Sequence, residues 1–460
     1  MTVTTLSLTI FLMAAGPRPP LIDAVKNVDH EAVRTLLKQG VNVNATEADG
    51  TTALHWASYR DDLETVDALI RAGGKVNAVN DLGATPLWTA CQNGSEAMVR
   101  RLLAAGANPN SALLLGETLV MVAARSGNPA VAELLLAKGA NVNAHAARGQ
   151  TALMWAVAQK HPEVVKVLLA HDADIHARSD AWGEVMAVPP HGYLDYNRSV
   201  PHGNDTALLF AARVGDLDSA RQLVAAGANV NDEDAWGITP TVLAAHSGFT
   251  DVVEFLLEKG ANVNAGKAGF TALHEAIMRR DEKLVKVLLD HGADANAPLR
   301  TWTPTRRTSR DFNFEPELVG ATPFWLAARF TEPEVMRLLV KHGADPLFVH
   351  HSDKVVEGRS GNPFDHRIEA TTALMAAAGM GGGGASWKPV ARGQREALVL
   401  EAVKIAVELG ADVNAANTDG RTALDSAKTL RFDSVVEFLT EKGAKPGIPK
   451  GSLPEPAPAR

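Results

Sequence analysis

Residues 237–264 read GITPTVLAAHSGFTDVVEFLLEKGANVN, and most of the chain repeats this stretch with variations. Thr239 and Pro240 predict the start of a short helix. The threonine oxygen can accept a backbone N–H at the N-cap, and the fixed φ of proline suits the first helical position. Gly248 is expected to end this helix, because glycine most easily takes the backbone conformation that follows a helix.

Residues 250–258 predict a second helix in the same stretch. It is amphipathic, and one face carries Val252, Val253, Leu256 and Leu257. Gly260 closes it, and Asn262 and Asn264 lead into an extended connection. Two short helices cannot bury both of their apolar faces alone, so this unit is expected to be stable only when stacked on copies of itself.

The copies are counted by the threonine that opens the first helix. It stands at Thr52, Thr85, Thr118, Thr151, Thr206, Thr239, Thr271, Thr322, Thr372 and Thr422. Subtraction gives steps of 33, 33, 33, 55, 33, 32, 51, 50 and 50 residues. A period of 33 residues therefore persists, with insertions at four of the joints.

Period and motif together resemble one family. The openings TALHWA at 52–57, TPL at 85–87 and TALHEA at 271–276 are similar to the T-P-L-H-x-A signature of ankyrin repeats, whose period is also 33 residues. The resemblance covers about residues 19–446, and phrases such as ALMWA and ANVNA resemble multi-repeat ankyrin proteins of environmental bacteria. It implies an all-α fold, an ankyrin-repeat α-solenoid of about eleven repeats.

The expected organisation is a single solenoid over 19–446, followed by a proline-rich disordered tail over 447–460. Insertions are expected near 178–203, 298–319, 347–370 and 379–395. The first three lie between a closing phrase and the next opening, so we call them the first, second and third fingers. The glycines of the fourth, which starts at Gly379, favour a hinge or crossover, because a phosphate loop would need a preceding strand and a following Lys-Ser/Thr.

Residues 1–16 resemble a secretory signal, with an apolar run over 6–15 that ends in small residues. The run is too short to cross a bilayer. No Lys or Arg precedes Arg18, so the usual positive start is missing. Export to the periplasm or medium is the prediction, and a frayed apolar tail on a cytoplasmic protein is the alternative.

Composition excludes some functions. Lys and Arg number 45 against 53 Asp and Glu, for a net charge of −8, which argues against binding nucleic acid through a broad basic field. The one cysteine, Cys91, rules out an internal disulfide and falls where other copies have alanine, so it is interpreted as a buried apolar residue. No cofactor motif appears, and a monomer is expected.

The family resemblance also implies a contact surface. In ankyrin repeats the variable position of the signature and two residues shortly after it line a concave groove that binds partners. Carried over to this chain, the predicted partner-binding residues are Trp56, Tyr59, Arg60, Gln92, Arg125, Trp155, Phe210, Arg213, His246, Met278, Arg279, Arg329 and Phe330. Trp, Tyr and Arg are enriched in interface hot spots. The row of arginines predicts a locally positive groove that suits a partner with carboxylates.

His55 and His274 occupy the signature position and are expected to make structural hydrogen bonds. The third finger holds the best candidate for a metal or catalytic cluster, composed of His350, His351, Asp353, Asp365 and His366. Their spacing matches no ligand set of known geometry, and a polar loop packed on a neighbouring finger is the simpler interpretation. The sequence thus predicts a non-enzymatic scaffold without cofactor or metal that binds a protein partner. The alternative is a metal-dependent or catalytic site built from the fingers.

Overall fold

The computed structural model describes residues 19–187, 197–303, 314–357, 364–382 and 392–448. The chain forms two compact units, a first up to Ala177 and a second from Arg178 onward. Each unit is described by itself. The predicted signal segment 1–16 and most of the tail 447–460 lie outside the described residues.

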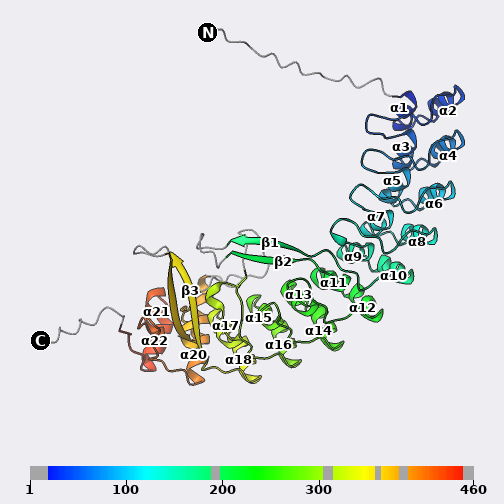
Figure 1. Cartoon of the computed structure of the whole chain (residues 1–460). Coiled ribbons are helices and arrows are strands. Elements are labelled where there is room, and N and C mark those ends of the chain that lie inside the picture. The colour runs from blue at the N-terminus through cyan, green and yellow to red at the C-terminus, as the bar shows by residue number, and fades with distance from the viewer. Residues whose placement is uncertain (1–18, 188–196, 304–313, 358–363, 383–391, 449–460) are drawn as a thin grey trace, which may run out of the picture. The chain divides into compact units, whose positions relative to one another are not determined.

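The first unit is a row of antiparallel helix pairs, each stacked beside the next (Figure 1). Its α-helices are α1 (Pro20–Lys26), α2 (His30–Lys38), α3 (Ala53–Tyr59), α4 (Leu63–Arg71), α5 (Pro86–Asn93), α6 (Glu96–Ala104), α7 (Leu119–Ser126), α8 (Pro129–Ala137), α9 (Ala152–Ala158) and α10 (Pro162–Ala170). A short 3-10 helix, η1 (Ala147–Gly149), precedes α9. Fully buried leucines and valines of both helices in a pair, such as Leu54 and Val66, form the core.

Threonine starts the helices as the sequence predicts. The Thr85 hydroxyl accepts the backbone N–H of Trp88 at 3.2 Å, and Thr239 does the same for Val242. Replacing such a cap by alanine costs about 1 kcal/mol. Gly94 and Gly248 follow their helices with φ of 68° and 81°, the left-handed conformation that favours glycine.

The asparagines of the closing phrase join one repeat to the next along an edge that we call the amide ladder. Asn110 donates its Nδ2 hydrogen to the carbonyl of Gly139 at 2.9 Å and accepts the backbone N–H of Asn141 at 2.7 Å. The same pair of bonds is made by Asn44, Asn77, Asn143, Asn231, Asn264, Asn296 and Asn414. The amide ladder explains why the Asn-Val-Asn motif recurs, because its second asparagine bonds the next repeat. The sequence alone did not reveal these bonds.

The second unit continues the helix-pair pattern and adds strands. Its helices are α11 (Ala207–Val214), α12 (Leu217–Ala225), α13 (Pro240–Ser247), α14 (Thr250–Glu258), α15 (Ala272–Met278), α16 (Glu282–Asp290), α17 (Pro323–Arg329), α18 (Pro333–Lys341), α19 (Ala373–Ala377), α20 (Arg392–Glu408), α21 (Ala423–Leu430) and α22 (Asp433–Glu441), with a 3-10 helix, η3 (Pro316–Leu318).

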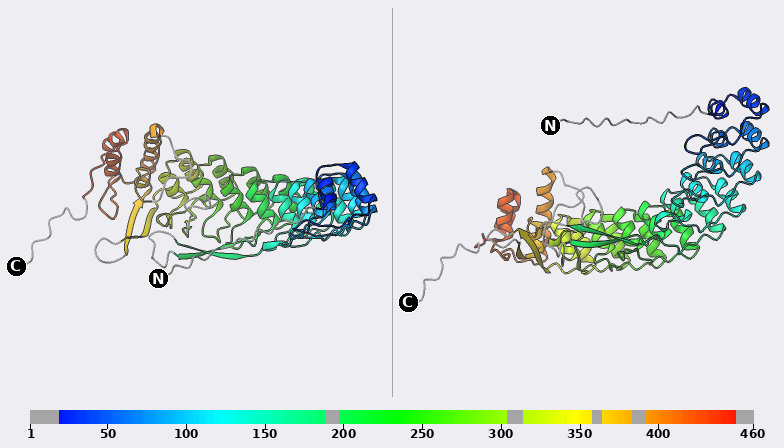
Figure 2. Two further views of the ribbon diagram at one scale, coloured as in Figure 1. Left: turned by 90° about the horizontal axis from the view of Figure 1, so that it is seen from above. Right: turned by 45° about the horizontal axis from the view of Figure 1, so that its top comes forward.

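The all-α prediction is wrong for two fingers, which contain β-hairpins. In the first finger β1 (Trp182–Ala187) pairs antiparallel with β2 (Asn197–His202), and in the third finger β3 (Val349–Glu357) pairs with β4 (Phe364–Thr372). The cause is the two-residue alternation of these inserts: His350 and Ser352 are buried while His351 and Asp353 are exposed. Figures 1 and 2 show the first hairpin extending along the row of helices from α11 toward α17.

The second finger packs on the outer half of the third, near the end of the β3–β4 hairpin that lies farthest from α18 and α19. Trp302 of the second finger and Val355 of β3 are buried together, with Val319 and Phe364 against them. Phe314 reaches the core of the helix pairs, where its ring lies 5.0 Å from that of Phe270. This agrees with the interpretation of the third finger as a loop that packs on its neighbour.

At the start of the fourth insertion, the backbone of the described residues packs closely against the ring of Trp325. Gly381 has φ of 93°, and a Cβ added there would stand 2.6 Å from the ring of Trp325. The glycine thus permits backbone to approach a buried indole, where the sequence had favoured a hinge. Among the described residues, no helix combines the length and apolar character that crossing a bilayer requires.

Candidate partner-binding face

The candidate site is the surface formed by the first helix of each pair and the turn that precedes it, which we call the inner face. In the first unit its predicted residues stay accessible. Tyr59, Arg60 and Gln92 are exposed, and Trp56 and Trp155 are half-buried. They stand on α3, α5 and α9, whose opposite faces carry the buried alanines and leucines of the stack.

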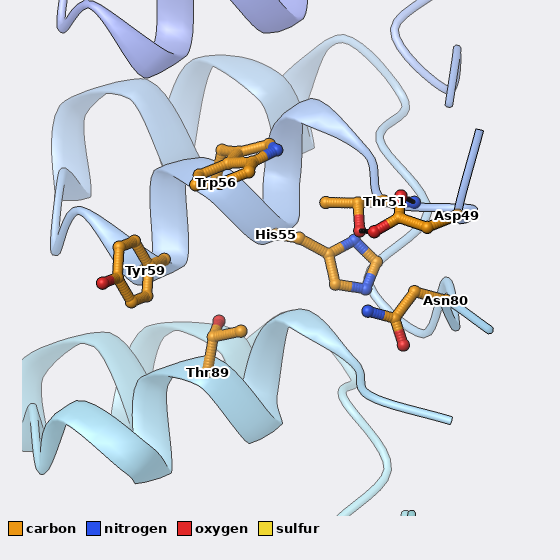
Figure 3. A pocket seen from close by; sticks show the side chains of 7 residues that line it. All are labelled: Asp49, Thr51, His55, Trp56, Tyr59, Asn80 and Thr89. Carbon is orange, nitrogen blue, oxygen red and sulfur yellow. Dashed lines mark hydrogen bonds between the residues drawn. The ribbon is translucent and has the colours of Figure 1, made fainter. Parts of the chain in front are cut away.

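A hollow opens on this inner face between the first two complete repeats (Figure 3). It has a volume of about 280 Å³, and its lining is formed by Asp49, Thr51, His55, Trp56, Tyr59, Asn80 and Thr89. The rings of Trp56 and Tyr59 lie at 88° to each other with centroids 5.9 Å apart. In Figure 3 they bound one end of the hollow, with Thr89 below and Asp49 and Asn80 at the other end.

Trp56 is held in place by a neighbouring ion pair. Its Nε1 hydrogen is donated to Glu47 at 2.7 Å, and the other carboxylate oxygen of Glu47 pairs with Lys26 at 2.6 Å. The Lys26 ammonium in turn lies 4.2 Å from the centre of the Trp56 ring. The ring orientation is therefore fixed before any partner arrives.

His55 closes the floor of the hollow and is structural, as predicted. Its Nδ1 accepts the backbone N–H of Thr52 at 3.2 Å, so its Nε2 carries the proton and donates to the carbonyl of Ala84 at 3.0 Å. Burial lowers the pKa of His55, which keeps the ring neutral. At the mouth, burial raises the pKa of Asp49, but hydrogen bonds from Thr51 outweigh it and hold that pKa below its ordinary value.

The arginines of the inner face are largely paired within the protein. Arg125 meets Glu117 at 2.8 Å and lies 5.3 Å from the ring of Trp155, and Arg213 meets Asp205 at 3.1 Å. Arg213 also lies 5.9 Å from the ring of Phe210, which is half-buried. These pairings offset much of the positive charge that the row of arginines had predicted.

In the second unit, one carboxylate on the inner face is fully buried. The carboxylate of Glu275 has no exposure and meets Nδ1 of His246 at 3.0 Å. Burial raises the pKa of Glu275, and His246 and Arg279 partly offset that rise. Arg279 donates to the carbonyl of His246 at 2.7 Å.

Three further predicted contact residues are covered. Met278 and Phe330 are only 2% and 3% exposed, so neither offers a surface to a partner. Arg329 donates from Nε to the carbonyl of Gly382 at 2.7 Å, and burial lowers its pKa. At Arg329 the cover comes from the start of the glycine-rich insertion, which supplies the Gly382 carbonyl.

Comparisons with known proteins cover more than half of the chain. A family model described as "Ankyrin repeats (3 copies)" matches residues 21–112, 102–179 and 208–298, and the single "Ankyrin repeat" model matches 319–351. The chain belongs to the ankyrin-repeat family.

Relatives come from several kingdoms. The chain is 30% identical over 267 residues to the Danio rerio protein "Putative palmitoyltransferase ZDHHC13", which covers 53% of this chain and 36% of that relative. It is 38% identical over 102 residues to an ankyrin repeat protein of Rickettsia felis, which covers 20% of this chain and 45% of the relative. The chain thus spans less than half the length of these relatives, and one of the two is bacterial.

One solved structure is similar over half the chain. The human ASB11 ankyrin repeat domain is 29% identical and aligns with a TM-score of 0.43, over 52% of this chain and 98% of that domain. The residues matched by family models in this chain are ankyrin repeats, a fold that is generally non-enzymatic.

The five residues of the candidate metal cluster do not converge in this ankyrin protein. Strand alternation places His350 on the buried face of the hairpin, where its Nε2 bonds the carbonyl of Glu317 at 3.0 Å. Asp353 and His366 meet at 3.1 Å on the exposed face. Burial lowers the pKa of His350 to about 4. The described residues contain no group of three or more such side chains arranged to hold a metal ion.

Two further features concern the single cysteine and a histidine of the first finger. Cys91 is fully buried, which confirms its interpretation as an apolar core residue, and burial raises the pKa of its thiol. In the first finger, the ring of His202 stacks on that of Trp182, with centroids 4.4 Å apart.

Sequence reasoning missed the acidic and amide groups of the inner face. Glu47, Asp49 and Asn80 belong to turns, and the family pattern of contact positions covers helix residues alone. Their signal in the sequence is position: each stands three to five residues before an opening threonine, Thr52 or Thr85. That spacing brings the turn over the start of the inner helix.

Proposed function

We propose that this chain is a non-enzymatic scaffold that binds a polypeptide partner along its inner face. The observation that carries the proposal is the accessible set Trp56, Tyr59, Arg60 and Gln92 in the first unit. Solenoids present extended surfaces through side chains that do not hold the stack together. Aromatic and arginine side chains on such a surface are the usual interface hot spots.

The finer organisation is part of the same proposal. The described residues contain 22 α-helices in consecutive pairs, which supports about eleven repeats in one solenoid over 19–446. We propose a monomer that binds no nucleic acid, because the chain carries a net charge of −8.

Capture from the native organism with tagged full-length protein, followed by mass spectrometry, identifies the partner. The inner-face variant Tyr59→Ala/Arg60→Ala/Gln92→Ala should then weaken binding at least tenfold, since truncating a hot spot costs about 2 kcal/mol or more. The control is Arg71→Ala/Lys138→Ala/Lys166→Ala, three exposed cations on the second helices of the same unit. It should change the affinity less than twofold.

The free energy of unfolding of both variants should stay within about 0.5 kcal/mol of the parent, because the six side chains are exposed and lie outside the core. Equal loss of binding in the two variants, or loss in the control alone, would contradict the proposal. A third variant, His351→Ala/His366→Ala on the exposed face of the third finger, tests the alternative. Loss of binding or of stoichiometric metal in that variant would favour a site on the fingers.

We also propose that residues 1–16 direct export. The support is the apolar run over 6–15 with small residues after it. Mature protein from the native host should begin near Ala15 or Gly16 and be found outside the cytoplasm. Recovery of Met1 or Thr2 at the N-terminus of cytosolic protein would contradict export.

A further inference from the structure

We propose that the hollow between Trp56 and Tyr59 takes one cationic side chain, a lysine or arginine, from the bound polypeptide. The inference rests on the proposed scaffold function and assigns the chemistry of one contact within it. It is carried by the side chains of one hollow in the first unit, which combine two aromatic faces with a single carboxylate (Figure 3).

The charge balance of the lining favours a cation. Asp49 is the one charged group among the seven lining residues, and its side chain is exposed at the mouth. His55, the other titratable group of the lining, is locked as a neutral ring because it accepts at Nδ1 and donates at Nε2. An anionic side chain would therefore meet one negative charge and no positive charge in this lining.

The Asp49 carboxylate retains capacity for a further hydrogen bond. It accepts the backbone N–H of Thr51 at 3.0 Å and the Thr51 hydroxyl at 2.9 Å. An ionised carboxylate offers about four acceptor positions, and the backbone N–H of Asp49 itself takes a third, so about one remains. The Thr51 bonds also fix the direction in which that position points.

The aromatic rings supply the second element of recognition. Cations are attracted to the faces of Trp and Tyr within about 6 Å of the ring centre. In this protein Trp56 already accepts the Lys26 ammonium at 4.2 Å, and Glu47 pairs with that ammonium. Trp56 and Tyr59 stand perpendicular, so a side chain that enters between them can meet the face of one ring and the edge of the other.

The size of the hollow limits the ligand to one side chain. Its volume of about 280 Å³ lies just below the roughly 300–1,000 Å³ that small-molecule sites occupy. The charged groups just outside the lining are mixed. Arg60 follows Tyr59 on α3 and is exposed, and Asp61 and Asp81 are exposed as well. The site is thus expected to select charge over a short range only.

The test uses full-length protein labelled with 5-fluorotryptophan and three peptides, acetyl-Gly-Xaa-Gly-amide with lysine, norleucine or glutamate as Xaa. The ¹⁹F signal of Trp56 is assigned by its loss in Trp56→Phe. The lysine peptide should shift this signal saturably, and norleucine, which has the same carbon chain without the terminal ammonium, should bind about fivefold more weakly. Glutamate should give no saturable shift.

Asp49→Asn should weaken the lysine peptide about two- to fivefold and leave norleucine unchanged, as expected for an exposed ion pair. The asparagine oxygen can still accept the Thr51 N–H, as Asn80 does for Leu82 at 3.1 Å, so the turn is retained. Asp81→Asn, which removes an exposed carboxylate on the neighbouring turn, is the matched control and should stay within twofold. Equal binding of lysine and norleucine, an unchanged Asp49→Asn, or no saturable shift with any peptide would overturn the cation site.

The two proposals fail in distinguishable ways. A captured partner that depends on Tyr59, Arg60 and Gln92 but is indifferent to Asp49→Asn would leave the scaffold standing and remove the cation site. A lysine peptide that binds as described, beside a captured partner that ignores the inner-face variant, would keep the cation site and remove the scaffold interface.

Discussion

In the first unit the turns between helix pairs are short, and the predicted contact residues remain at the surface. Tyr59 is 49% exposed, for example. In the second unit Met278 and Phe330 are buried at the same helix positions, and Arg329 bonds the carbonyl of Gly382 in the glycine-rich insertion. The same repeat thus builds an open inner face in one region and a covered one in the other.

The difference shows that the family pattern of contact positions predicts an accessible side chain only where the repeat is regular. Glu275 stands at the same signature position as Trp56, yet it is fully buried beside His246. A buried carboxylate needs such partners, because its desolvation is costly. Glu275 therefore belongs to the interior of the second unit, whereas Trp56 stays accessible in the first.

The largest expected change in stability tests whether the second finger contributes to the core. Phe314→Ala should destabilise the protein by about 3–5 kcal/mol, because the ring is fully buried against Phe270. Leu115→Ala, at a 77% exposed turn residue of the first unit, is the control and should stay within about 0.5 kcal/mol. Denaturant unfolding followed by far-UV circular dichroism measures both. A similar cost for the two would show that the finger is not part of the core.

The next prediction compares two glycines. One allows a close contact with a side chain, and the other is needed only for its positive φ. Gly381→Ala should cost about 2–4 kcal/mol, since the new Cβ would meet Trp325 at 2.6 Å and the φ of 93° disfavours a side chain. Gly106→Ala in the first unit has φ of 87° but open space around it, and should cost about 1–2 kcal/mol. The same unfolding measurement applies. If the two glycines cost the same, the covering contact on Trp325 contributes little.

Much of the fold could be predicted from the sequence because each helix boundary is determined by residues close to it in the chain. Threonine caps, such as Thr85, and terminal glycines, such as Gly94, act within a few residues, and the 33-residue period fixes the stacking. The role of His55 followed from the same motif. The closing asparagines were visible as a pattern, but their bonds reach a turn about 30 residues later, as from Asn110 to Gly139 and Asn141.

The rest depended on contacts between segments far apart in the chain. Burial of Met278 and Phe330 cannot be inferred from a signature that describes one repeat at a time. The hollow was missed because it joins Asp49 of one turn to Thr89 of the following inner helix. The third-finger hairpin depends on pairing between β3 and β4 and on the alternation of buried His350 and Ser352 with exposed His351 and Asp353, which the repeat signature does not describe.

The pH dependence of the free energy of unfolding tests the comparison at His274, the histidine of the repeat signature. Burial lowers the pKa of His274 to about 4, whereas an unfolded histidine titrates near 6.5. The folded-state pKa is depressed, so this group's contribution to stability is complete above about pH 6.5 and is lost as the pH falls toward 4. From pH 7.5 to 5 the parent should lose about 2 kcal/mol that His274→Met does not lose.

The first unit supplies the control for this titration. His55→Met should flatten the pH dependence less, because His55 lines an open hollow beside Asp49, whereas His274 lies edge-on to Phe314 with ring centres 6.4 Å apart. Methionine already fills this position at Met121 and Met154, so neither change should prevent folding. Unfolding free energies at pH 5 and 7.5 give the result. Equal flattening by both variants would mean that the second finger does not change the environment of His274.

The smallest effect concerns the amide ladder, which is the same in both units. Asn110→Ala removes a bond to Gly139 and one from Asn141, and Asn264→Ala removes the matching bonds to Gly292 and Asp294. Each bond is exposed, so its net contribution is modest, and we expect about 1 kcal/mol of destabilisation at each site. The two costs should agree because neither bond pair involves a finger. Hydrogen exchange of the backbone amides of Asn141 and Asp294 reads the effect locally, and each should exchange faster only in its own variant. A cost at Asn264 several times that at Asn110 would mean that the insertions act on this edge as well, and the contrast between the units would then extend beyond their inner faces.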